Sequence, residues 1–164
     1  MKEGNYGLIK SDLHKIKLLI NHCLIPTFIG FLIYIFFRSK ELNVFKWLSF
    51  FNSEIDAIRH YTLKLKIFIP EWIYYSLVDA LWTYSITSSI MIYWINDKKN
   101  IGMIIWLFIV FLITILYEIL QMFDFPFIIG TFDYYDVVLC SIFYIISILF
   151  FINKSKKNDE KINF

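Results

Sequence analysis

The chain has 164 residues, of which 59% are apolar and 21% aromatic, and its mean hydropathy is +0.61. This composition is more apolar than that of a soluble domain of the same length, so it predicts a membrane protein. The net charge of +2 is too small to indicate a nucleic-acid partner, because such binding needs many Lys and Arg contacts to phosphate.

Four long apolar stretches predict an all-α, polytopic membrane protein: a bundle of four transmembrane helices in which residues 1–164 form a single domain. The predicted spans cover residues 16–37, 72–95, 101–123 and 134–152. Pro26 lies inside the first span, where its missing N–H predicts a kink, and Pro70 precedes the second, as suits a helix start. Because each crossing needs about 20 residues, no room is left for a separate catalytic domain.

The first loop, residues 38–71, alternates aromatic and charged residues, a pattern typical of a segment that lies along the membrane surface. It could be a spacer there or a lid that contacts substrate. With both termini inside, ten of the 16 Lys and Arg residues lie on the inner side and six, all in this loop, on the outer side. The excess predicts that both termini are cytoplasmic and that residues 38–71 are extracytoplasmic.

Five polar residues lie within or beside three of the spans, although a charge near the bilayer centre costs about 2.5–3.5 kcal/mol. They are Asp79, Glu118, Gln121, Asp133 and Asp136. The third span ends where the fourth begins, and Asp79 lies near the same end of the second. Connectivity therefore predicts that these groups meet at one membrane depth, under either orientation of the chain.

Carboxylates held close together need a cation, a proton or a hydrogen-bond donor. They could coordinate a divalent cation, act as general acid or base at a lipid headgroup, or pair with Arg59, His60 or a partner protein. Alternatively, Asp133 and Asp136 simply cap a helix end. The sequence holds no Cys/His metal pattern and no known hydrolase motif, so we assign no metal, and it identifies no cofactor.

Residues 117–121, which contain Glu118 and Gln121, and residues 130–138, which contain Asp133 and Asp136, resemble the signature of the VanZ-like membrane protein family. Members carry a Glu-x-x-Gln pair near the end of one span and an Asp that opens the next. Where the family has an Arg in the intervening loop, this chain has Gly130. The resemblance implies a bacterial cell-envelope protein in the inner (cytoplasmic) membrane, and it implies a location more than a reaction.

Our first hypothesis is an outer-leaflet polar site that binds or acts on the headgroup of a lipid or lipid-linked glycan. Glu118 and Asp136 are its candidate catalytic residues, and four further residues are candidates for substrate binding: Asp79, Gln121, Asp133 and Arg59. The second is a non-enzymatic subunit whose polar groups pair with another membrane protein of a larger complex. A third, a proton-coupled or ion-conducting element, is opposed by the absence of polar residues that continue toward the cytoplasmic side. The lipid bilayer is the predicted partner in every case.

Overall fold

The computed structural model describes residues 12–38, 52–95, 100–123, 125 and 132–162, and every regular element in these ranges is a helix. The all-α class is therefore confirmed for this part of the chain. Residues 39–51 of the predicted interfacial loop lie outside the described ranges, as do residues 96–99 of the charged turn. Gly130 and its neighbours 126–129 and 131 lie outside them too.

The first membrane helix changes its winding just before Pro26. Residues 12–19 are α-helical, η1 (Ile20–Leu24) is a π-helix, and α2 (Ile25–Phe37) completes the segment. Pro26 has no N–H, and in a regular helix its ring would collide with the carbonyl of His22. A wider turn at this point relieves the collision. The whole stretch Asp12–Phe37 is long and apolar enough to cross a membrane, and it begins earlier than the predicted residue 16.

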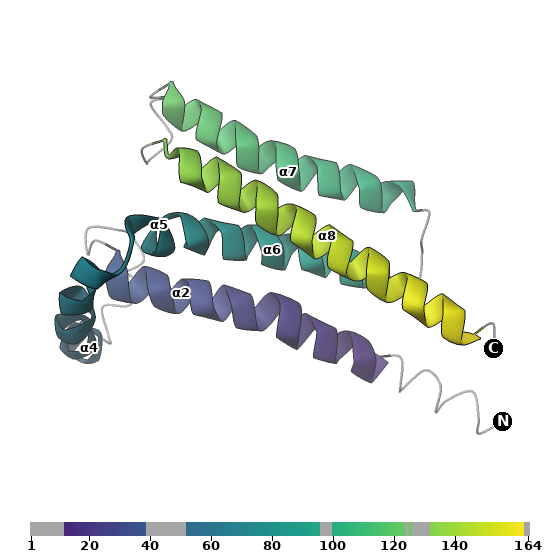
Figure 1. Cartoon of the computed structure of the whole chain (residues 1–164), viewed down its shortest axis with the longest axis horizontal. Coiled ribbons are helices and arrows are strands. Elements are labelled where there is room, and N and C mark those ends of the chain that lie inside the picture. The colour runs from purple at the N-terminus through teal and green to yellow at the C-terminus, as the bar shows by residue number, and fades with distance from the viewer. Residues whose placement is uncertain (1–11, 39–51, 96–99, 124, 126–131, 163–164) are drawn as a thin grey trace.

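The second predicted span, residues 72–95, is divided in the structure at Tyr75. A single turn, α5 (Glu71–Tyr74), precedes the 18-residue helix α6 (Ser76–Tyr93). α6 packs against α2, α7 and α8 and runs alongside α2 through the bundle (Figure 1). Gly30 permits a close approach to α2, since a Cβ there would lie 3.0 Å from Trp82 Nε1. Tyr34 stacks on the same Trp82 ring with 6.1 Å between centroids.

The helices that are long and apolar enough to cross a membrane are, among the described residues, Asp12–Phe37, Ile101–Met122 and Tyr134–Ser155. α6 is not one of them, because it is rich in serine and threonine. Apart from that of Ser76, its serine and threonine hydroxyl groups are nevertheless paired. Thr83, Ser85 and Thr87 each donate to the backbone carbonyl four residues earlier at 2.8–2.9 Å. A helix covered by protein on several sides need not be apolar to be stable within a bundle.

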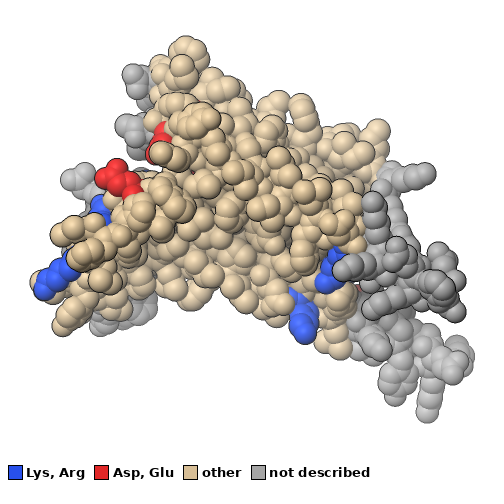
Figure 2. All heavy atoms as spheres, in the orientation of Figure 1, with Lys and Arg blue, Asp and Glu red and all other residues tan. Residues whose placement is uncertain are grey.

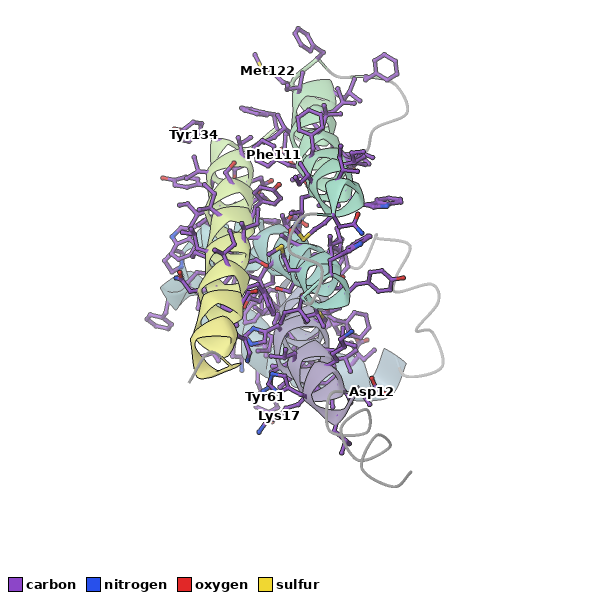
Figure 3. All side chains as sticks on the ribbon, turned by 90° about the vertical axis from the view of Figure 1, so that its right-hand side faces the viewer. Asp12, Lys17, Tyr61, Phe111, Met122 and Tyr134 are labelled. Atoms are coloured by element: carbon purple, nitrogen blue, oxygen red, sulfur yellow. The ribbon has the colours of Figure 1, made fainter. Side chains whose placement is uncertain are left out.

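The last two long helices are α7 (Ile101–Met122) and α8 (Tyr134–Ile162), close to the predicted spans 101–123 and 134–152. Asn100 caps α7 by accepting a hydrogen bond from the Gly102 amide at 2.8 Å. The Tyr144 hydroxyl donates to the Leu107 carbonyl at 3.0 Å and ties α8 to α7. Figure 3, a view along the bundle, shows Phe111 between these helices and other apolar side chains projecting outward from α7.

Charged side chains gather at the two ends of the molecule. Figure 2 shows the visible Lys, Arg, Asp and Glu residues at these ends, with none across the broad band between them. Large apolar side chains are exposed along the helices of that band, for example Phe28, Phe108 and Ile145. Uncharged, apolar sides of this kind suit hydrocarbon, so the fold is that of a membrane protein.

At one end of the bundle α4 (Asn52–Leu65) and the short η3 (Lys66–Phe68) lie beside the end of α2 (Figure 1). α4 exposes Tyr61 and Leu63 as well as Lys64. A mixed surface of this kind fits a segment at the membrane interface. Its position on a membrane surface stays a prediction.

α6 is joined to its neighbours by two side-chain pairs within the bundle. His22 Nδ1 lies 2.7 Å from the Tyr84 hydroxyl, and the Phe150 ring lies 4.5 Å from the His22 ring between centroids. The hydroxyls of Ser88 and Ser147 are 2.9 Å apart. These pairs fix how η1, α6 and α8 face one another, because in a water-poor interior a polar group has few other partners.

We expect Tyr84→Phe to lower the free energy of unfolding by about 1 kcal/mol, because it removes the partner of His22 and keeps the ring. The measurement is reversible unfolding of the detergent-solubilised protein by SDS. Tyr93→Phe is the matched control, since Tyr93 is on the same helix and 73% exposed. Equal losses in the two variants would contradict a role for the hydrogen bond.

Candidate functional site

The predicted polar residues of three helices lie at the same end of the bundle. α6 begins there, α7 ends there and α8 begins there (Figure 1). The acidic cluster consists of Asp79 in the first turn of α6, Glu118 near the end of α7, and Asp133 and Asp136 at the beginning of α8. The other three carboxylates each act electrostatically on Glu118. The structure thus brings together all four acids that the sequence singled out.

Glu118 is the most enclosed acid of the cluster, with only 6% of its surface exposed. The backbone amide of Asp133, at the beginning of α8, faces the Glu118 carboxyl group as a hydrogen-bond donor. The second carboxyl oxygen, Oε2, is buried and has no hydrogen-bond partner. Such an acceptor is costly to keep inside a protein, so its retention calls for an explanation.

Asp136 faces Glu118 from the first turn of α8 and is 8% exposed. The fully buried Ser76 hydroxyl, at the first residue of α6, lies next to the Asp136 carboxyl group. Neither Asp136 Oδ1 nor Ser76 Oγ closes a hydrogen bond. A carboxyl oxygen of α7 and one of α8 are therefore both buried without a donor.

The remaining two acids of the cluster have partners of their own. Asp133 caps α8, since its Oδ1 accepts from the Tyr135 amide at 2.9 Å. This is the helix-capping role that the sequence left open for Asp133 and Asp136. Asp79 forms an ion pair with Arg38, described next. Gln121, three residues beyond Glu118 on α7, is buried at 8% exposure.

Arg38, directly after α2, supplies the cluster with a cation. Its Nη2 lies 3.7 Å from Asp79 Oδ2 and 3.5 Å from the Tyr75 carbonyl oxygen, to which it donates. The guanidinium lies over the Tyr75 ring at 4.6 Å and the Tyr34 ring at 5.6 Å from the centroids. Its Nε is buried with no hydrogen-bond partner. In the sequence, Arg38 entered only the count of charges that predicts orientation. A cation at the end of one span and an acid near the same end of the next span are the signal that could have indicated the pair.

Arg59 reaches the site from α4 and holds the end of α2. Its guanidinium donates to the Ile35 carbonyl and, at 2.7 Å, to the Arg38 carbonyl. These carbonyls lie at the C-terminal end of a helix, where no intrahelical donor remains, so Arg59 acts as a cap. Burial lowers the pKa of Arg59 and the Asp56 carboxylate acts in the opposite direction, yet arginine stays protonated. Its predicted part in substrate binding stays a prediction.

The cluster holds more acids than cations. The carboxylates of Asp79, Asp133 and Asp136 act electrostatically on Glu118, and Arg38 is engaged with Asp79. Among the described residues, no group of three or more His, Cys, Asp or Glu side chains is arranged to hold a metal ion. What the cluster can do with the groups present is accept hydrogen bonds or a proton from a molecule that brings donors.

Comparison of the chain with protein-family models, with curated proteins and with solved structures gives no match.

The Arg38 and Asp79 pair can be tested by a double-mutant cycle. We expect Arg38→Gln and Asp79→Asn each to destabilise the protein and the two changes to be coupled by about 0.5–1 kcal/mol. The value is small because the side chains are 23% and 39% exposed, which lets solvent screen the pair. SDS unfolding of the four proteins measures the coupling, and strictly additive losses would contradict the ion pair.

Proposed function

We propose that this chain is a cell-envelope membrane protein that binds the headgroup of a lipid or lipid-linked glycan at the acidic cluster. The observation that carries the proposal is the pair of buried carboxyl oxygens, Glu118 Oε2 and Asp136 Oδ1, that lack hydrogen-bond donors. Both acceptors belong to the acidic cluster, on helices whose exposed sides are apolar. A polar ligand that donates hydrogen bonds to them would account for their retention.

The proposal includes α6 as a fourth transmembrane helix. Support comes from its 18 residues, which rise about 27 Å and so approach the thickness of the hydrocarbon core. The described chain also begins and ends at the same end of the bundle, as an even number of crossings requires (Figure 1). With the excess of Lys and Arg near the termini, both termini would be cytoplasmic and the acidic cluster would lie in the outer leaflet.

The resemblance to the VanZ-like family supports a role for the same residues in the site. Glu118, Gln121, Asp133 and Asp136 match the polar positions of that signature. In the proposal Glu118 and Asp136 contact the ligand directly. If binding leads to a reaction, these two would take up or give protons, since each has a carboxyl oxygen not engaged elsewhere. Asp79, Gln121 and Asp133 would support them, and Arg59 would hold the backbone at Arg38.

The test compares the lipids that remain bound after gentle solubilisation, measured by native mass spectrometry. We expect the wild type to retain a defined lipid and Glu118→Gln and Asp136→Asn to lose it, since each replaces an anionic acceptor by a neutral amide. Glu71→Gln is the matched control: it makes the same chemical change at an exposed position of α5 near this end of the bundle. All proteins must first be equally abundant and folded.

The same lipid profile in all four proteins would contradict the proposal. The second hypothesis, a subunit that pairs its polar groups with another membrane protein, would then be the better account of the cluster. A protein that crosslinks to position 118 and is lost in Glu118→Gln would identify that partner.

A further inference from the structure

The buried atoms without partners at this site include charged groups of two opposite kinds. Glu118 Oε2 and Asp136 Oδ1 are buried acceptors on groups that can carry negative charge. Arg38 Nε is a buried donor on a group that is always positive. The two kinds lie near one another: Arg38 Nη2 is 3.5 Å from the Tyr75 carbonyl oxygen, and the next residue, Ser76, lies beside the Asp136 carboxyl group. A ligand that carries a cationic donor and, next to it, an anionic acceptor would therefore satisfy both kinds of atom.

The two carboxyl oxygens, Glu118 Oε2 and Asp136 Oδ1, would select among ligands by hydrogen bonding as well as by charge. A primary ammonium group has three N–H donors, which is enough to reach both free carboxyl oxygens. A trimethylammonium group carries the same charge and has no N–H, so both oxygens would stay unsatisfied. A purely anionic headgroup would be repelled, because Asp79, Glu118, Asp133 and Asp136 meet here.

The Arg38 guanidinium is positioned to bind an anion. Arg38 is fixed between the Tyr75 ring and Asp79, while its backbone carbonyl is held by Arg59. Its side chain is 23% exposed and that of Asp79 39% exposed, so the site reaches the surface on this side. A phosphate oxygen that arrives there would meet the partly exposed guanidinium of Arg38, whose buried Nε–H has no acceptor of its own.

We propose, resting on the headgroup site above, that the ligand is a phospholipid with a zwitterionic headgroup and a primary amine, of the phosphoethanolamine type. Its ammonium group lies between Glu118 and Asp136, and its phosphate lies at Arg38. A lipid is favoured over a lysine of a partner protein because α7 exposes large apolar side chains at the level of Glu118, such as Leu116 and Ile119, which suit contact with acyl chains.

The experiment uses the full-length wild-type protein and a series of lipids that differ only in N-methylation. Phosphatidylethanolamine, its monomethyl and dimethyl derivatives and phosphatidylcholine have the same chains and phosphate but lose one N–H at each step. Pairwise competition is read by native mass spectrometry in the same detergent. We expect binding to fall at each step, with an overall preference of about tenfold for the primary amine over the trimethylated lipid. Phosphatidylglycerol, which has no amine, should compete least.

Variants test where the ammonium group and the phosphate of the headgroup bind. Glu118→Gln and Asp136→Asn should bring the preference for phosphatidylethanolamine over phosphatidylcholine close to one, whereas Glu71→Gln should leave it unchanged. Arg38→Gln should weaken both lipids alike, because both carry the phosphate. The wild-type series does not depend on any variant folding.

The outcomes separate this inference from the proposed function. Lipid that is retained by the wild type and lost in Glu118→Gln, but with equal affinity for the primary amine and the trimethylated headgroup, would overturn the amine inference and leave the headgroup site standing. Lipid binding that does not change in Glu118→Gln would overturn both. A partner protein whose lysine crosslinks to position 118 in place of lipid would overturn the choice of a phospholipid.

Discussion

A membrane interior offers no water to polar groups, and the structure answers this constraint by placing its most polar long helix where protein surrounds it. α6 carries serine and threonine along much of its length, and it packs against α2, α7 and α8. The hydroxyls of Thr83, Ser85 and Thr87 return to its own carbonyls, and Ser88 pairs with Ser147. The outer helices can then be almost wholly apolar, and the charged groups are confined to the two ends.

The acidic cluster departs from this rule. At most places in the bundle a buried polar atom has a protein partner, but Glu118 Oε2, Asp136 Oδ1 and Arg38 Nε do not. Glu118 lies near the end of α7, Asp136 lies in the first turn of α8, and Arg38 directly follows α2. A site built from the ends of several helices combines charged groups with access from the membrane surface, which one position in the middle of a single helix could not do.

Much of this arrangement follows from the sequence by simple physical reasoning. The apolar runs predicted the long helices closely, and connectivity alone predicted that Asp79, Glu118 and Asp136 would meet. What it missed has local causes. The π-helix before Pro26 and the break at Tyr75 depend on backbone detail that periodicity does not record. The capping role of Arg59 depends on how α4 turns back onto α2, which no pattern in either segment predicts.

Arg59 donates one of its hydrogen bonds to the backbone carbonyl of Arg38, and the side chain of Arg38 is the cation of the site. Thr62 adds a second attachment one turn along, to the Phe36 carbonyl at 3.2 Å. These bonds join α4 to the end of α2 at neighbouring residues. The Arg38 backbone is therefore held from α4, while its side chain is held by Asp79 and Tyr75. A substitution that loosens α4 would thus act on the cation of the site, although α4 contributes no acid to the cluster.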